Sequence, residues 1–141
     1  MPEPRTRTIV SARLKLNVVE WGDPSAPPLV LQHGGRDHAR SWDPVAEAFA
    51  GEWRVIAPDL RGHGDSGWSP AGAYEFADHA SDLDGLVGAL GLGRFSLLGT
   101  SMGGMVARRI AVNAPHRLEA LILMDTSHGP LAALDGELIE M

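Results

Sequence analysis

The sequence contains no cysteine, so disulfide bonds, thiolate metal sites and a cysteine nucleophile are excluded within its 141 residues. Basic residues are also few. Twelve lysines and arginines stand against 18 aspartates and glutamates, which gives a formal net charge of −6. Nucleic acids and anionic membrane surfaces need a basic footprint on the protein that binds them, so neither is expected as a partner.

Long apolar runs are lacking as well. No segment approaches the roughly 18 apolar residues of a membrane-spanning helix. The stretch from Met1 to Arg5 has no apolar run like that of a signal peptide. We therefore expect a cytoplasmic location and no membrane partner. The hydrophobic fraction of 44% is enough for one packed core, and no cofactor or metal is expected.

Short apolar runs alternate with helix-like segments along the chain. Two strands of a hairpin are predicted first, followed by four strands of the kind that is buried on both faces. These strands are residues 8–10 and 14–21, then residues 29–32, 53–57, 95–98 and 118–124. Buried strands that alternate with helices indicate βαβ units. We predict an α/β fold with a mostly parallel sheet, an N-terminal antiparallel hairpin and helices on both faces.

The first helix is expected to begin at Ser41, a residue type that caps helix N-termini. The spacing of Trp42, Val45 and Phe49 indicates the stripe that this helix buries against the sheet.

Two further helices are predicted. Residues 76–90 repeat apolar side chains every three or four positions, with Gly91 placed to end the helix. His79 is expected on the solvent face of this helix. Residues 101–114 form the last helix, which Pro115 closes.

The last of these helices begins in a pattern of the form G-x-S-x-G, at Gly99-Thr100-Ser101-Met102-Gly103. The pattern lies between a predicted strand and a predicted helix, where a sharp turn exposes a serine as a nucleophile. Such a turn is strained and needs small residues two positions before and after the serine. We therefore predict that Ser101 is a nucleophile. The simpler alternative is a glycine-rich turn whose serine caps the helix.

A second glycine-rich turn, His33-Gly34-Gly35-Arg36, directly follows the first central strand. Backbone amides can stabilise an oxyanion where small residues let the chain approach the substrate. The predicted donors are the amides of Gly35 and Met102, the second at a helix N-terminus, where N–H groups lack intrahelical acceptors. An ordinary turn is the alternative. His33 is expected to bond the backbone of its loop and not to act as a general base.

These two segments, together with residues 59–66 (Asp-Leu-Arg-Gly-His-Gly-Asp-Ser), occur in an order that closely resembles the α/β-hydrolase superfamily. The nearest likeness is to the branch with esterases, enol-lactonases, haloperoxidase-like enzymes and C–C bond hydrolases. The resemblance implies a serine hydrolase of a carboxylic ester or a similarly activated carbonyl, with residues 59–66 as a structural brace. C–C bond hydrolysis and perhydrolysis stay open, because those enzymes share these motifs.

The family's order of catalytic residues is a serine, then an acid, then a histidine. Asp125 follows the strand at residues 118–124, where a minority of the family places the acid, and is the candidate acid; a turn cap is the alternative. His116 is excluded as a base, because the helix holds it about 20 Å from Ser101. His128 is the only plausible substitute, and it is expected to be an ordinary residue of the pocket rim or surface.

The domain expectation follows from the same resemblance. Residues 1–128 are predicted to be the N-terminal part of a hydrolase core that lacks its later strands, and residues 129–141 the start of a cap helix. The apolar strand at residues 118–124 would then have an open edge. A C-terminal polypeptide of a longer protein, or another copy, is expected to cover it. Beside a small ester-like substrate, a non-catalytic binding role and an inactive truncated chain stay open.

Overall fold

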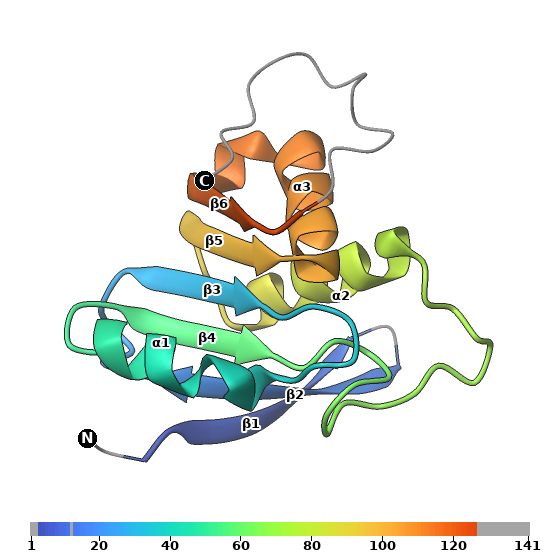
Figure 1. Ribbon diagram of the computed structural model, residues 1–141, viewed down its shortest axis with the longest axis horizontal. Coiled ribbons are helices and arrows are strands. Elements are labelled where there is room, and N and C mark those ends of the chain that lie inside the picture. Colours follow the sequence, from blue (N-terminus) through green and yellow to red (C-terminus); the bar gives the residue numbers. More distant parts are fainter. Residues whose placement is uncertain (1–2, 12, 127–141) are drawn as a thin grey trace.

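The computed structural model describes residues 3–11 and 13–126. Within them, six strands form one sheet in the order β1-β2-β4-β3-β5-β6 (Figure 1). The strands are β1 (Arg5–Ser11), β2 (Leu14–Trp21), β3 (Pro28–Gln32), β4 (Arg54–Pro58), β5 (Phe95–Thr100) and β6 (Leu118–Met124). The predicted α/β fold is confirmed. No helix among the described residues has the length and apolarity needed to cross a membrane.

The hairpin forms one edge of the sheet. β1 pairs antiparallel with β2, and β2 pairs antiparallel with β4 on its other side. Side chains of β2 alternate between exposed and buried at its start, where Lys15 is exposed and Leu16 is buried. From Val18 onward every residue of β2 is buried, because this part of the strand also pairs with β4, beginning at Pro58.

The central part of the sheet is parallel. β3 lies between β4 and β5, and β5 pairs in the same direction with β6. The run from Leu29 to Leu31 is at most 7% exposed, and so is the run from Val55 to Ala57. Both faces of these strands are covered, which is why the sequence shows unbroken apolar runs there. The carboxyl ends of the parallel strands meet at one edge, where such sheets place their sites.

The helices lie on both faces of the sheet, as predicted (Figure 1). They are η1 (Ala39–Trp42), α1 (Asp43–Phe49), α2 (Phe76–Ala89), α3 (Met102–Asn113) and η2 (Pro115–Arg117). On the α1 face, Trp42 packs in one core cluster with Leu31. On the opposite face, Leu83 of α2 and Val106 of α3 pack in a second cluster with Val30. Neighbouring residues of β3 therefore contribute to two separate cores.

The end of α2 follows the prediction closely. Gly91 has φ of 66°, a left-handed conformation that glycine adopts without a steric penalty. Its N–H donates to the carbonyl of Gly88, and the N–H of Leu92 donates to that of Val87, both at 3.1 Å. This pair of bonds is the Schellman motif, which ends a helix.

Two predictions about the first helix are wrong. Ser41 is not an N-cap: it lies inside η1, α1 follows directly after Trp42, and the Ser41 hydroxyl donates to the carboxylate of Asp37. Phe49 is 46% exposed instead of buried. It is the last residue of α1, and Ala50 and Trp53 beyond the helix pack against the core in its place.

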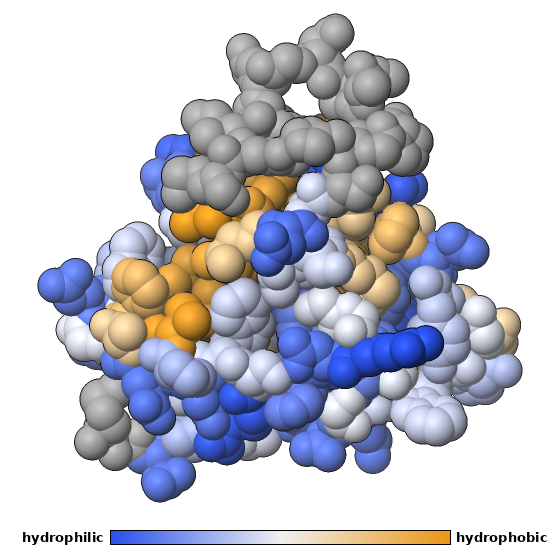
Figure 2. Space-filling view, in the orientation of Figure 1, coloured by the Kyte–Doolittle hydropathy of each residue, from blue (hydrophilic) through white to orange (hydrophobic). Residues whose placement is uncertain are grey.

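β6 forms the other edge of the sheet among the described strands. Leu121 and Leu123 pack into the core that α2 and α3 cover. On the opposite face, Ala120 and Met124 are exposed and Ile122 is half-buried. Figure 2 shows hydrophobic side chains gathered at the surface on the α1 side of the molecule. Among the described strands, β6 is thus an edge strand with exposed apolar side chains, and the expectation that further polypeptide covers it stays a prediction.

Candidate active site

Ser101 lies on the turn that joins β5 to α3. Its backbone has φ of 52° and ψ of −121°, a region that costs of order 1–3 kcal/mol for a residue with a Cβ atom. The side chain is exposed and makes no capping hydrogen bond to α3. Ser101 thus occupies the N-cap position of α3 without the side-chain hydrogen bond of a capping serine.

Gly99 and Gly103 occupy positions where no side chain fits. A Cβ atom on Gly99 would overlap the carbonyl oxygen of Gly103. One on Gly103 would overlap the carbonyl oxygens of Gln32 and His33 at the end of β3. Both obstacles are backbone atoms, which cannot rotate out of the way. The two glycines let α3 begin in direct contact with β3, the close packing that the motif predicts.

The substitution Gly103→Ala should lower the free energy of unfolding by about 1–3 kcal/mol, because the added methyl group forces backbone apart. Gly88→Ala is a matched control in α2, where an added Cβ meets no atom within 4 Å. It should raise stability by about 0.5–1 kcal/mol through helix propensity. Urea unfolding measures both. A Gly103→Ala variant as stable as the parent would contradict the packing described.

Backbone hydrogen bonds hold the turn in place. The N–H of Ser101 donates to the carbonyl of Met124 in β6 at 2.9 Å, and the Ser101 carbonyl accepts from the N–H groups of Gly104 and Met105. The Thr126 hydroxyl adds a bond to the Ser101 carbonyl at 3.3 Å. Sequence reasoning missed Thr126, whose only signal was its place just beyond the predicted strand at residues 118–124.

The predicted oxyanion loop lies directly against this turn. A Cβ atom placed on Gly34 would be 3.3 Å from the Cβ of Ser101 and 3.8 Å from its Oγ. One placed on Gly35 would be 3.6 Å from the Sδ of Met102. Met102 is the first residue of α3, so its N–H has no acceptor within the helix. The structure thus brings Gly35, Ser101 and Met102 together at the carboxyl ends of β3 and β5.

His33 supports this loop and is completely buried. Its Nε2 accepts from the N–H of Leu60 at 3.0 Å, and its Nδ1 lies 2.6 Å from the carbonyl oxygen of Gly34. An acceptor at Nε2 and a donor at Nδ1 describe the neutral Nδ1–H tautomer. Burial lowers the pKa of His33 below its ordinary value. Both ring nitrogens bond backbone, as predicted, so neither is free to act as a base toward Ser101.

Asp59 begins the segment that was predicted to be a brace, residues 59–66. Its carboxylate accepts from the N–H of Ala39 at 2.7 Å, the Nδ2 of Asn17 at 2.9 Å and the N–H of Asp65 at 3.0 Å. These bonds tie the segment after β3, the loop after β4 and the hairpin to one carboxylate. A structural role as a brace accounts for all three hydrogen bonds.

Arg61 adds a buried ion pair to the same segment. Its Nε and an Nη atom each donate to an oxygen of Asp82 in α2 at 2.7 Å. The two side chains are 7% and 6% exposed. A further Nη atom donates to the carbonyl of Ala73 at 2.9 Å. The pair fastens the long loop between β4 and α2 to the helix that follows it.

The prediction that His79 faces solvent is wrong. His79 is 2% exposed and lies below the loop that Arg61 fastens. The ring of His63 from that loop is centred 6.5 Å from the ring of His79 and 5.3 Å from that of His33. Burial lowers the pKa of His79 as well. Two buried neutral histidines, His33 and His79, therefore lie near this site, whereas the sequence pattern indicated only His33.

These two histidines predict an acid-sensitive fold. Their pKa values are lowered in the folded chain from an ordinary 6.5, so the unfolded chain binds more protons just below that pH. Stability should therefore be full above about pH 6.5 and fall as the pH drops below it. Urea unfolding across pH 5 to 8 measures this, and the variant His79→Leu should show a shallower fall. A constant free energy of unfolding between about pH 7 and 5 would contradict the prediction.

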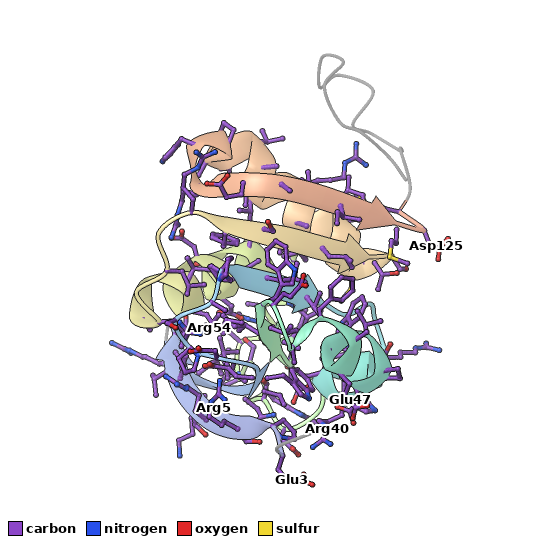
Figure 3. The ribbon with its side chains drawn as sticks, turned by 90° about the vertical axis from the view of Figure 1, so that its left-hand side faces the viewer. Glu3, Arg5, Arg40, Glu47, Arg54 and Asp125 are labelled. Carbon is purple, nitrogen blue, oxygen red and sulfur yellow. The ribbon has the colours of Figure 1, made fainter. Side chains whose placement is uncertain are left out.

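Asp125, the candidate acid, comes directly after β6 and is exposed (Figure 3). Its φ is 51°, and the residue before it, Met124, accepts the Ser101 N–H. Asp125 therefore directly follows the residue whose carbonyl accepts the Ser101 N–H, which places its backbone next to the Ser101 turn. Among the described residues, no hydrogen bond joins its carboxylate to a histidine.

Of the two histidines that follow the Ser101 turn in the sequence, His116 offers no base to Ser101. His116 is exposed in η2, at the far end of α3 from Ser101, as predicted. The substitute base His128 and the predicted cap segment, residues 129–141, lie outside the described residues.

A family profile decides the relationship of the chain to known proteins. The profile of the alpha/beta hydrolase fold matches residues 27–139. The chain belongs to the α/β-hydrolase fold family. The match includes the His33 loop, the Asp59 segment and the Ser101 turn.

Individual relatives agree with this family. The α/β-hydrolase chain is 37% identical over 116 residues to a 3-hydroxybutyrate-oligomer hydrolase of Cupriavidus necator, covering 81% of the chain and 39% of the relative. It is 34% identical over 116 residues to an esterase of Mycobacterium tuberculosis, covering 82% and 38%. In structure it resembles the thioesterase domain from the curacin biosynthetic pathway, with a TM-score of 0.85, 27% identity and coverage of 94% and 52%. The α/β-hydrolase chain thus spans less than two thirds of the length of these proteins.

Proposed function

We propose that the chain carries the nucleophile and the oxyanion donors of a serine hydrolase acting on a carboxylic ester or a similarly activated carbonyl. One observation carries the proposal: Ser101 is exposed on a left-handed turn that is packed directly against the Gly34–Gly35 loop. A strained, solvent-facing serine is costly for a fold that has no use for it. The hydrolase and esterase relatives support the same class of reaction.

In the proposed reaction, Ser101 Oγ loses its proton to a base and attacks the carbonyl carbon of the ester. The amides of Gly35 and Met102 donate to the oxyanion of the tetrahedral intermediate. The leaving alcohol takes a proton from the same base as the C–O bond breaks. Water then gives a proton to the same base as it attacks the acyl carbon, and the base returns that proton to Ser101 Oγ as the bond to the acyl group breaks and the carboxylic acid leaves.

The base for this reaction is proposed to come from outside residues 3–126. His33 uses both ring nitrogens for backbone bonds, and His116 is at the far end of α3. We propose that a C-terminal polypeptide of a longer protein covers the open edge of β6 and supplies a histidine. Asp125, exposed beside the Ser101 turn, is the proposed acid for it. The domain arrangement, with a hydrolase core over residues 1–128 and the start of a cap over residues 129–141, stays a prediction. A cytoplasmic location also stays a prediction.

Labelling with a fluorophosphonate, which reacts with activated serines, tests the proposal. The full-length protein should be labelled at Ser101, and its Ser101→Ala variant should not. The 141-residue chain alone should label weakly or not at all, with labelling restored when a C-terminal piece is added. Full labelling of the 141-residue chain by itself would contradict the external base.

The alternatives appear as other outcomes of the same experiment. A full-length protein that binds ester-like molecules but is not labelled would overturn the hydrolase and favour a binding protein. Labelling without ester hydrolysis would favour C–C bond hydrolysis or perhydrolysis at the same serine.

A further inference from the structure

A small internal cavity lies between the end of β3 and α2. Its volume is about 10 Å³, and most of its wall is apolar. Four polar side chains also line it: those of Gln32, Asp59, His79 and Asp82. All four residues are at most 4% exposed. The cavity is therefore a buried, mostly apolar space with polar residues in its wall, and Ser101 is not among its lining residues.

Two buried side-chain atoms of these residues have no hydrogen-bond partner in the described part of the chain. They are Nε2 of Gln32 and Nδ1 of His79. A buried polar atom without a partner costs about 1–3 kcal/mol. Both atoms belong to residues that line one cavity, so a single shared partner there would remove both penalties.

We propose that this cavity is the binding site of one structural water molecule, which accepts from Nε2 of Gln32 and donates to Nδ1 of His79. The size fits, because one water occupies about 10–15 Å³ on this measure of volume. The second proton of the water has acceptors in the carboxylates of Asp59 and Asp82, which line the same cavity. Buried waters typically make about three hydrogen bonds, and this site offers them.

The chemistry of the wall favours water over a cation. The unpartnered atom of Gln32 is an amide nitrogen, which can only donate, and a cation offers it no acceptor. The described residues contain no cluster of three or more acidic, histidine or cysteine side chains suited to a metal. An apolar occupant would leave both orphan atoms without partners.

The water would join two elements that the sheet does not connect directly. Gln32 is the last residue of β3 and immediately precedes the His33 loop, whereas His79 belongs to α2. Because Nδ1 of His79 accepts the hydrogen bond from the water, His79 must be the neutral tautomer with its proton on Nε2. His33 has the opposite, Nδ1–H, tautomer. The proposal therefore predicts two buried neutral histidines of opposite tautomer, and it does not depend on the proposed function.

Crystallography of the intact protein at high resolution tests the site. One density peak should lie within hydrogen-bond distance of both Gln32 Nε2 and His79 Nδ1. The near-isosteric variant Gln32→Met should lose this peak. Leu16→Met, at an apolar position of the same wall, should keep it. Absence of the peak from the parent protein, or its persistence in Gln32→Met, would overturn the proposal.

Nitrogen NMR of the histidine side chains provides a test that needs no variant. The proposal expects the Nε2–H pattern for His79 and the Nδ1–H pattern for His33 in one spectrum at neutral pH. An Nδ1–H pattern for His79 would contradict the proposed direction of the hydrogen bond and would overturn the site as assigned.

Discussion

Replacing Ser101 by alanine should lower the hydrolytic rate of the intact enzyme by about 10⁴- to 10⁶-fold, because the nucleophile cannot be replaced by water in the same position. Stability should change by less than about 0.5 kcal/mol. The hydroxyl is exposed and caps nothing, so its loss removes no described hydrogen bond. Alanine also keeps the Cβ atom, and with it the strain of the turn.

The variant Ser101→Gly separates the effect of backbone strain on stability from the effect of the missing nucleophile on activity. Ser101→Gly should be as inactive as Ser101→Ala, yet more stable than the parent by about 1 kcal/mol, because glycine adopts a positive φ without a Cβ clash. Ester hydrolysis by colorimetric assay and urea unfolding measure the two effects. If the glycine variant were less stable than the alanine variant, the strain assigned to φ of 52° would be wrong.

Breaking the Arg61–Asp82 pair should have the largest effect on stability. Both side chains are buried, and two hydrogen bonds of 2.7 Å join them. Asp82→Asn leaves the Arg61 charge without a counter-ion, which typically costs about 3–5 kcal/mol when a buried pair is broken. The long loop between β4 and α2 should lose its attachment to α2, and with it the cover over His79.

The double variant Arg61→Met with Asp82→Leu is the control for this prediction. Replacing both charges by apolar side chains is often neutral or stabilising, since no charge is then left buried alone. We expect the double variant to recover most of the stability that Asp82→Asn loses, measured by urea unfolding. A double variant as unstable as the single one would show that the pair acts through something other than charge compensation.

Local pattern was sufficient to predict the elements that carry the site. The strand at residues 118–124 was predicted at its observed bounds, and the Ser101 turn was predicted from five consecutive residues. Both depend on interactions within a few residues of each other. Unbroken apolar runs indicate strands buried on both faces, and the glycines at 99 and 103 fit only a turn of this shape.

Long-range contacts explain what sequence reasoning missed. His79 is buried because the loop containing His63 folds across α2, and nothing within α2 indicates this. Asp82 is buried because its partner Arg61 is 21 positions away. Ser41 failed as a cap because an extra helical turn, η1, precedes α1. The base for Ser101 is the extreme case, since the proposed histidine comes from outside the described residues.

The central claim is that Ser101 forms an acyl-enzyme. It is tested most directly by mixing the intact enzyme with p-nitrophenyl acetate, quenching in acid and mapping the acetyl group by peptide mass spectrometry. The account predicts one acetyl group on the peptide that contains Ser101, and none on that peptide in the Ser101→Ala variant. Undiminished hydrolysis by Ser101→Ala, or acetylation confined to another residue, would contradict it.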